Sequence, residues 1–248
     1  MAQEYRSSDW STYVMDWRGD PHPVMEPPDE EVAEIDRALK ALADYGILPN
    51  ARYDKERFLA HRQAVRARFE IPWTGISPRM QRLLYAINAI ARPPVMVAIG
   101  VFCGNTFISN AGAAIGPGAS YRAKRLVGIE INTKEADRAR RNVATIDEEG
   151  EAEIIGMDGV TWLEDYDGTI DLLYIDADGA YRSIIEEASR GALRAGSLVL
   201  AHNSVNQESE LADYLAFVRD PRNSVESVNM IVDDQGLEVT LWRSGARK

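Results

Sequence analysis

Two glycines and one acidic residue mark a ligand site in the middle of the chain. Gly100 ends an apolar run that begins at Val95, and Gly104 follows just before a helical stretch. Glycine lets the backbone turn sharply and approach a ligand, and a helix start exposes free N–H groups. Glu130 lies near the carboxyl end of the next apolar run, slightly beyond the spacing of about 20 residues at which an acid meets ribose hydroxyls in dinucleotide folds. The pattern indicates a nucleotide-type pocket.

A second group of polar residues follows two later apolar runs. Asp176 comes after residues 171–175, and His202 and Asn203 come after residues 197–201. The separation accommodates one strand-helix-strand crossover, which would bring these side chains to the same edge of a parallel sheet. His202 has an ordinary pKa near 6.5, so it could accept a proton while Asp176 orients its ring. The alternative interpretation is a capping histidine after a buried strand.

The apolar runs alternate with helical stretches beyond Pro94. We expect strands at 95–99, 125–131, 152–155, 171–175 and 197–201, with helices that include 134–144 and 181–193. Such alternation is typical of a parallel sheet covered on both faces. Two further runs, 227–232 and 237–242, are joined by a short turn and predict a terminal hairpin. The prediction is an α/β fold with a doubly wound, mostly parallel seven-stranded sheet and an antiparallel C-terminal hairpin strand.

The first 75 residues differ from the rest. Residues 1–29 are rich in proline and read as an irregular segment, whereas apolar spacing predicts helices at 29–44, 54–69 and 79–91. We therefore divide the chain into an N-terminal extension, 1–75, and a main domain, 76–248. Trp10, Trp17 and Trp73 are apolar anchors that predict a lid or a subunit contact, which would make a homo-oligomer or recruit a partner subunit.

Composition excludes several classes of partner. The 248 residues carry a net charge of −11, which argues against nucleic-acid binding. No apolar run is long enough for a membrane span, and the N-terminus lacks a signal-peptide core, so we expect a cytoplasmic protein. The single cysteine, Cys103, excludes an intrachain disulfide and a cysteine-based metal site.

Five segments in order resemble one family. They are Ala98–Gly104, Val127–Glu130, Gly156–Gly159, Ile170–Asp178 and Leu193–Asn203. Together they resemble the class I S-adenosylmethionine-dependent methyltransferases, and within that family the small-molecule O-methyltransferases of the catechol and caffeoyl-CoA type. The resemblance covers roughly residues 76–242 and implies a Rossmann-like domain. It implies S-adenosylmethionine as cofactor, bound by Gly100, Phe102, Gly104, Glu130, Ile131, Asp158, Gly159 and Asp176. For Asp158, a role as a helix N-cap is the competing interpretation.

The resemblance also implies a divalent metal ion held by Asp176, His202 and Asn203. Metal-dependent relatives place a second Asp where His202 stands, and they usually carry a lysine base where Gly179 stands. The histidine would favour Zn, Mn or Fe over Mg. Many relatives also have an acidic residue at the position of Ala98, near the methionine moiety. These departures keep open both a metal site and a metal-free site with His202 and Asp176 as catalytic residues.

The leading functional prediction is methyl transfer from S-adenosylmethionine to an oxygen or nitrogen of a small-molecule metabolite. The alternative is a methyltransferase-fold enzyme of natural-product biosynthesis that catalyses an elimination or cyclisation with His202 as base. A third hypothesis makes the chain a non-enzymatic subunit that docks a partner through its Trp-rich extension. The intact Gly100 to Glu130 pattern argues against that hypothesis.

Overall fold

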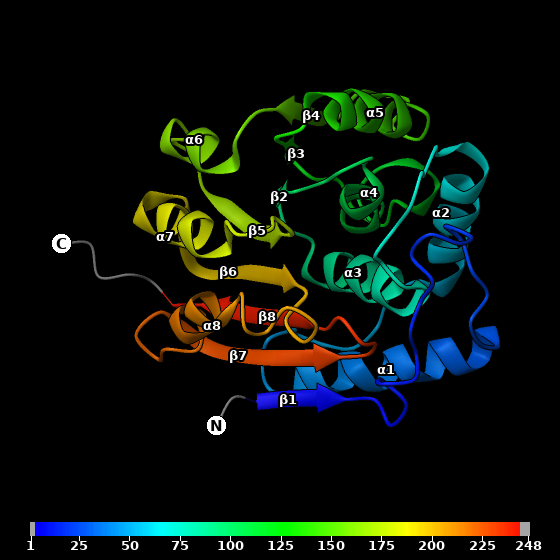
Figure 1. Cartoon of the computed structure of the whole chain (residues 1–248), viewed down its shortest axis with the longest axis horizontal. Helices are drawn as coiled ribbons and strands as arrows, with labels where there is room; N and C mark the ends of the chain where they lie inside the picture. The colour runs from blue at the N-terminus through cyan, green and yellow to red at the C-terminus, as the bar shows by residue number, and fades with distance from the viewer. Residues whose placement is uncertain (1–2, 244–248) are drawn as a thin grey trace.

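The computed structural model describes residues 3–243 and contains one mixed eight-stranded sheet (Figure 1). The strand order is β1-β7-β8-β6-β5-β2-β3-β4, and β8 runs antiparallel to both β6 and β7. The strands are β1 (Gln3–Arg6), β2 (Val95–Ile99), β3 (Arg125–Glu130), β4 (Ala152–Gly156), β5 (Ile170–Ile175), β6 (Leu193–His202), β7 (Ser224–Ile231) and β8 (Leu237–Trp242). The predicted α/β class and the antiparallel hairpin are confirmed.

Helices cover both faces of the sheet (Figure 1). The helices are α1 (Pro28–Asp44), α2 (Lys55–Arg68), α3 (Pro78–Ala91), α4 (Asn105–Ala111), η1 (Gly116–Gly118), α5 (Thr133–Ala144), α6 (Gly159–Glu164), α7 (Tyr181–Gly191) and α8 (Ala212–Val218). One apolar core joins α1, α3, α4 and α5 to one face, and a second joins α6, α7 and α8 to the other. Burial on both sides explains why the central strands are nearly continuous apolar runs.

The winding direction reverses between β2 and β5. The chain proceeds from β2 to β3 and β4 on one side of this point, and from β5 to β6 on the other. In sheets of this kind the loops at the carboxyl ends separate at the reversal and leave a crevice for a ligand. The topology therefore places the loops after β2, β3, β5 and β6 around one site.

The sheet has one strand more than the predicted seven. Residues 1–29 were expected to be irregular, but Gln3–Arg6 forms β1, which pairs in parallel with β7 at the sheet edge. The Tyr5 hydroxyl donates a 2.6 Å hydrogen bond to Glu34 of α1 and fixes the strand over that helix. This pairing partner lies more than 200 residues away in the chain, so local spacing could not indicate it. The predicted extension thus contributes to the sheet of the main domain.

The remaining elements follow the sequence closely. Helices expected at 29–44, 54–69 and 79–91 appear as α1, α2 and α3, while α8 was not predicted. The strand expected at 197–201 extends over the whole of β6. Residues 1–2 of the predicted extension and 244–248 of the predicted main domain lie outside the described residues. None of the helices within residues 3–243 combines the length and the apolar composition needed to cross a membrane.

Candidate active site

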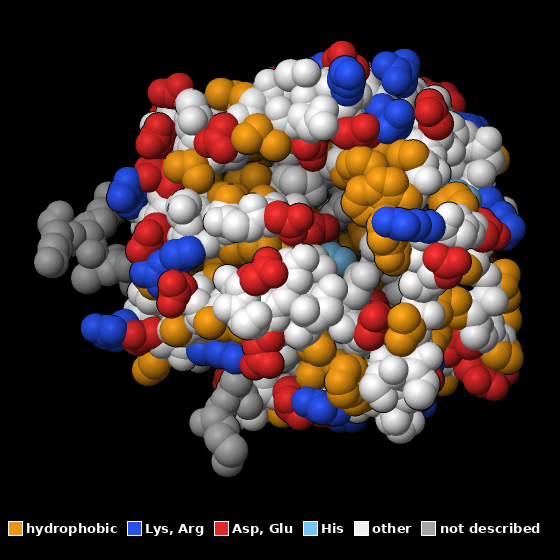
Figure 2. All heavy atoms as spheres, viewed as in Figure 1, with side chains coloured by type: hydrophobic (Ala, Val, Ile, Leu, Met, Phe, Trp, Pro, Cys, Tyr) orange, Lys and Arg blue, Asp and Glu red, His pale blue; other side chains and the backbone are white. Residues whose placement is uncertain are grey.

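A cavity of about 760 Å³ lies at the reversal point, where the carboxyl ends of the central strands meet. Figure 2 shows it as a hollow near the centre of one face, with hydrophobic and acidic side chains around its rim. Most of the residues predicted to bind cofactor or to act in catalysis line it, namely Gly100, Phe102, Glu130, Ile131, Asp158, Gly159, Asp176, His202 and Asn203. Gly104 is the exception, and it serves instead as the N-cap of α4. The fold thus brings together the two groups of residues that the sequence analysis identified separately.

The loop after β2 depends on glycine for two reasons. Gly100 has φ of +83°, and a Cβ built on it would lie 1.8 Å from the carbonyl oxygen of Asp176. Gly104 has φ of +91°, and Phe102 between them is also left-handed, with φ of +49°. Such conformations strain residues that carry a Cβ. The loop after β2 therefore packs directly against the end of β5, and only glycine fits at Gly100.

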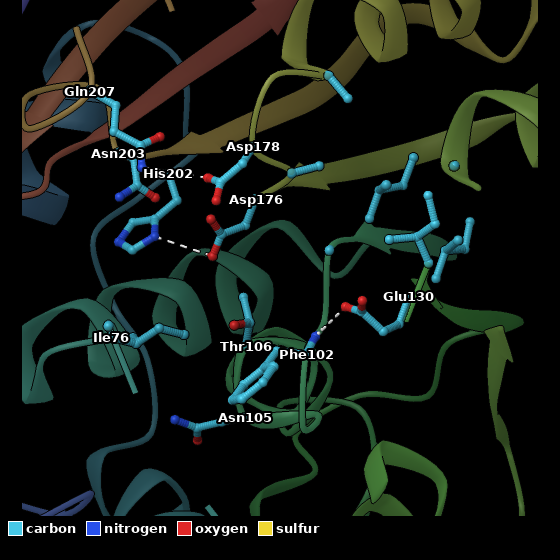
Figure 3. A pocket seen from close by; sticks show the side chains of 18 of the residues that line it. Ile76, Phe102, Asn105, Thr106, Glu130, Asp176, Asp178, His202, Asn203 and Gln207 are labelled. Carbon is cyan, nitrogen blue, oxygen red and sulfur yellow. Dashed lines mark hydrogen bonds and ion pairs between the residues drawn. The ribbon is translucent and has the colours of Figure 1, made fainter. Parts of the chain in front are cut away.

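Glu130 faces the cavity from the end of β3. Its carboxylate is buried, accepting one hydrogen bond from the Phe102 N–H at 2.7 Å and one from the Asn132 N–H at 2.9 Å. Figure 3 shows the side chain pointing toward the Phe102 nitrogen. A carboxylate has about four acceptor positions, so two remain for a ligand. Two acceptors on a fixed carboxylate fit the vicinal hydroxyls of a ribose, and the side chain of the next residue, Ile131, is 69% exposed beside them.

Asp158 and Gly159 begin α6 at the same edge. One Asp158 oxygen accepts a 2.9 Å hydrogen bond from the Thr161 N–H, which makes Asp158 the N-cap of the helix. The competing interpretation from sequence is thus observed, while Asp158 also lines the cavity. A Cβ on Gly159 would lie 2.4 Å from Ile99, so glycine lets α6 approach β2 closely. Both residues therefore shape the edge of the cavity beside β4.

Asp176 and His202 meet at the ends of the adjacent strands β5 and β6. His202 Nδ1 lies 3.3 Å from an Asp176 oxygen, and the two side chains turn toward each other in Figure 3. The hydroxyls of Tyr174 and Tyr181 each lie 3.4 Å from the Asp176 carboxylate as hydrogen-bond donors. Burial and the Asp176 charge raise the pKa of both tyrosines well above the ordinary value, so both stay protonated donors. Asp176 therefore has several donors that fix its position.

His202 is buried, and its environment favours the charged form of the ring. Burial alone lowers the pKa of His202, but Asp176, Asp233 and the Gln235 amide outweigh that effect and raise it above the ordinary value. If Nδ1 carries the proton and donates to Asp176, Nε2 is left as an acceptor. Nε2 has no hydrogen-bond partner among the described residues. The arrangement is that of an oriented histidine whose second ring nitrogen is buried and unpaired among the described residues.

The donor set predicted for a metal is partly engaged in other contacts. His202 Nδ1 pairs with Asp176, and the Asn203 amide nitrogen donates to Asn206 at 3.1 Å. Within residues 3–243, no group of three or more His, Cys, Asp and Glu side chains is arranged to hold a metal ion. Asp176, His202 and Asn203 lie together, so metal binding stays a prediction, and no step below depends on it.

Other residues line the cavity without having been predicted as site residues. Trp17 comes from the N-terminal segment, Trp73 to Ile76 from the stretch before α3, and Gln235 from the hairpin turn between β7 and β8. The tryptophans were noted from sequence as apolar anchors, which was the only signal for their position. Nothing near Gln235 in the sequence indicates that the hairpin turn reaches His202.

The part of the chain that forms most of this cavity matches a known protein family. Residues 97–204 match a family model described as a methyltransferase domain. No match to the chain was found among curated proteins.

Several solved structures share the fold. An O-methyltransferase of Bacillus cereus, solved with SAH, is 19% identical with a TM-score of 0.56, over 77% of this chain and 92% of that chain. An O-methyltransferase of Streptomyces achromogenes involved in tomaymycin synthesis, solved with SAM, is 20% identical with a TM-score of 0.57, over 77% and 91%. A Podospora anserina methyltransferase, bound to SAH, is 15% identical with a TM-score of 0.60, over 89% and 99%.

These matches agree with the segment pattern in the sequence. The family-model match spans the loops after β2, β3, β4, β5 and β6 that surround the cavity. Two of these neighbours were solved with SAH and one with SAM. Residues 97–204 therefore match a methyltransferase domain, and the fold of the chain resembles that of O-methyltransferases of known structure.

Proposed function

We propose that the protein transfers a methyl group from S-adenosylmethionine to an oxygen or nitrogen of a small-molecule metabolite in the cytoplasm. The observation that carries the proposal is a single cavity with Glu130 on one side and the Asp176–His202 pair on the other. Its volume of about 760 Å³ lies in the range of small-molecule sites. The net charge of −11 supports a small molecule over a nucleic acid as acceptor.

The cofactor would occupy the β2, β3 and β4 side. Glu130 would accept hydrogen bonds from the ribose, and Gly100 and Phe102 of the adjoining loop would line the same side of the cavity. When bound, the cofactor supplies a methyl group on a positively charged sulfur. Four carboxylates line the cavity, Glu130, Asp158, Asp176 and Asp178, and they favour a cationic ligand over an anionic one.

The acceptor would occupy the β5 and β6 side. His202 Nε2 would accept the proton that the acceptor oxygen or nitrogen gives up on methylation, while the cofactor would supply the methyl group and be left as the neutral thioether. The new charge on the ring would be stabilised by Asp176 at Nδ1, 3.3 Å away. General-base catalysis of this kind contributes about 10²- to 10⁴-fold, and alignment of the two ligands contributes the rest.

The first experiment tests cofactor binding. At 100 times its dissociation constant, S-adenosylhomocysteine should stabilise the protein by about 2.7 kcal/mol, which raises the melting temperature by several degrees. Glu130→Ala removes charge-assisted hydrogen bonds worth about 1.5 to 3 kcal/mol and should weaken binding at least tenfold in calorimetry. No stabilisation of the wild type would overturn the proposal and favour the non-enzymatic hypothesis.

The second experiment tests the chemistry. The enzyme is incubated with S-adenosylmethionine and a panel of phenols, catechols and aromatic amines, and S-adenosylhomocysteine is measured by mass spectrometry. His202→Ala should reduce turnover at least 100-fold if His202 is the base. Loss of turnover with a chelator, restored by one divalent ion, would instead assign His202 to a metal. Conversion of an acceptor without S-adenosylhomocysteine release would favour the elimination or cyclisation alternative.

A further inference from the structure

The side chains that line the cavity carry negative charge without matching positive charge. Glu130, Asp158, Asp176 and Asp178 line it, whereas no Lys or Arg side chain within residues 3–243 does so. Charges of one sign in a hollow with apolar walls reinforce one another, and they raise the local concentration of oppositely charged ligands. The cavity therefore discriminates between ligands by their charge as well as by their shape.

Among the described residues, Asp178 is the cavity carboxylate with the fewest partners. Glu130 accepts two backbone N–H hydrogen bonds, Asp158 caps α6, and Asp176 lies within hydrogen-bond distance of three side chains. Asp178 is exposed, and its contact is a long one of 3.5 Å from the side-chain amide nitrogen of Gln207. A carboxylate has about four acceptor positions, so most of those on Asp178 remain for a ligand.

Gln207 supplies a second acceptor beside Asp178. Its amide nitrogen is directed to Asp178, and its amide oxygen is buried without a hydrogen-bond partner among the described residues. Figure 3 shows both side chains on the His202 side of the cavity, away from Glu130. An ammonium group has three N–H donors and no acceptor, so a carboxylate next to an amide oxygen matches it. Asp178 and Gln207 together therefore suit a ligand ammonium.

Two arginines that flank cavity-lining segments make their contacts outside the cavity. Arg18 belongs to the N-terminal loop, residues 9–26, and stacks on an indole of that loop with its guanidinium carbon 4.2 Å from the ring centroid. Arg79 closes the base of the loop, because its buried guanidinium makes two hydrogen bonds to Asp9 at 2.8 and 2.9 Å and two to Glu26 at 2.8 and 2.5 Å. Neither guanidinium lines the cavity, so neither offsets its negative charge from within.

We propose that the acceptor is a cationic small molecule. Its ammonium group is bound by Asp178 and Gln207, and the atom that receives the methyl group faces His202. Asp178 follows β5 and His202 ends β6, two adjacent parallel strands, so one small ligand can reach both. The inference rests on the proposed function for methyl transfer alone, because a charge preference is a property of binding and needs no turnover. Acceptors that carry a carboxylate or a phosphate are repelled by the same carboxylates.

The test uses three probes that share one skeleton and differ in charge. Tyramine is cationic, 4-propylphenol is neutral and 3-(4-hydroxyphenyl)propanoate is anionic at neutral pH. Each is titrated into the full-length protein with and without S-adenosylhomocysteine, and affinity is measured by ligand-observed NMR. The wild type should bind tyramine at least about tenfold more tightly than the propanoate. Higher salt should weaken tyramine binding and leave 4-propylphenol binding unchanged, since screening acts on charges.

Asp178→Asn removes the charge of the side chain and retains its shape. It should weaken tyramine binding about three- to fivefold, as expected for an exposed ion pair, and leave 4-propylphenol binding unchanged. Asp178→Glu keeps the charge and should retain most of the tyramine affinity. The matched control is Glu210→Gln, because Glu210 is also an exposed carboxylate but does not line the cavity. This control should leave all three affinities unchanged.

The proposal is overturned if tyramine binds no more tightly than the propanoate, or if Asp178→Asn leaves tyramine binding unchanged or weakens all three probes alike. Equal losses in Asp178→Asn and Glu210→Gln would also overturn it, because the effect would then reflect overall charge. S-adenosylhomocysteine affinity should be the same in Asp178→Asn and wild type; a weakened affinity would assign Asp178 to the cofactor and overturn the proposal. Failure of S-adenosylhomocysteine to bind the wild type would contradict the proposed function alone, because the charge preference is also measured without it.

Discussion

The two sides of the cavity, to which we assign the cofactor and the acceptor in the proposed function, are built in different ways. The cofactor side is made by three loops that each directly follow a strand, with Gly100 after β2, Glu130 at the end of β3 and Asp158 after β4. The acceptor side combines segments from distant parts of the chain, with Trp17 near the N-terminus and Gln235 near the C-terminus. The cofactor side therefore follows from the local succession of strand and loop, whereas the acceptor side depends on contacts between distant segments of the chain.

The difference extends to how each side is held. On the cofactor side, backbone groups fix the site: Glu130 accepts from two backbone N–H groups, and Gly100 packs on a backbone carbonyl. On the acceptor side, side chains fix one another, as Arg79 holds the N-terminal loop and Asp176 orients His202. On the cofactor side, few substitutions of the glycines are compatible with the backbone contacts. On the acceptor side, each side-chain contact can be weakened by a single substitution.

The largest effect should come from Gly100→Ala. The new Cβ would lie 1.8 Å from the Asp176 carbonyl oxygen in a left-handed conformation. Overpacking and backbone strain together should cost about 3 kcal/mol or more of the free energy of unfolding. S-adenosylhomocysteine binding should be lost, since the loop that lines the cavity must move. Chemical denaturation and calorimetry measure the two effects.

Gly179→Ala is the matched control on the acceptor side. Gly179 also has a positive φ, +72°, but a Cβ there would meet nothing within 4 Å. Only backbone strain of about 1 to 2 kcal/mol is expected, with cofactor affinity unchanged. Equal losses in the two variants would contradict the claim that the close contact at Gly100, rather than its φ, holds the cofactor side together.

Arg79→Lys should give an intermediate effect confined to the acceptor side. Lysine cannot form the paired hydrogen bonds that the guanidinium makes with both Asp9 and Glu26. The free energy of unfolding should fall by about 1 to 2 kcal/mol, because charge-assisted hydrogen bonds are lost while a cation remains. The N-terminal loop should open more often, so trypsin should cleave after Arg18 faster than in the wild type.

Arg82→Lys provides the comparison for that variant. Arg82 lies on the same helix, α3, is equally buried, and pairs with Glu31 of α1 rather than with the loop. It should lower stability without accelerating cleavage after Arg18. If both variants accelerate cleavage equally, the effect reflects global opening, and Arg79 does not specifically close the N-terminal loop.

The contrast between the two sides of the cavity also explains which site residues could be predicted from the sequence. Gly100, Glu130 and Asp176 could be predicted because each ends or directly follows a strand whose apolar run is evident in the local sequence. The pairing of His202 with Asp176 followed from the crossover rule for parallel strands.

Other features depend on contacts that no local pattern carries. β1 pairs with a strand more than 200 residues away, the Arg79 contacts join Asp9 and Glu26 to α3, and Gln235 reaches His202 through a hairpin turn. These contacts arise from the packing of the whole chain, so neither periodicity nor turn chemistry indicates them. The N-terminal tryptophans were recognised as anchors, yet their place at the cavity needed the fold.

The smallest expected effect concerns the protonation of His202. The raised pKa means that the folded state binds the proton more tightly than the unfolded state, whose histidine has the ordinary value near 6.5. The resulting stability is fully present below pH 6.5 and is lost as the pH rises through the pKa of the folded state. As a base, His202 must be neutral, so turnover should rise with pH through that same pKa.

Asp176→Asn removes the largest of the contributions that oppose the effect of burial, so the pKa of His202 should fall relative to the wild type. The stability deficit of the variant should be greatest at acidic pH and should shrink as the pH rises. NMR titration of the ring signals measures the titration midpoint of His202 directly. The His202 signal can be distinguished from those of the other two histidines, because burial lowers the pKa of His61 to about 3 and that of His22 below its ordinary value. Asp178→Asn, whose side chain pairs with Gln207 instead, should leave the His202 midpoint in place. An unchanged midpoint in Asp176→Asn would mean that Asp176 does not tune the base, and that the acceptor side works by alignment alone.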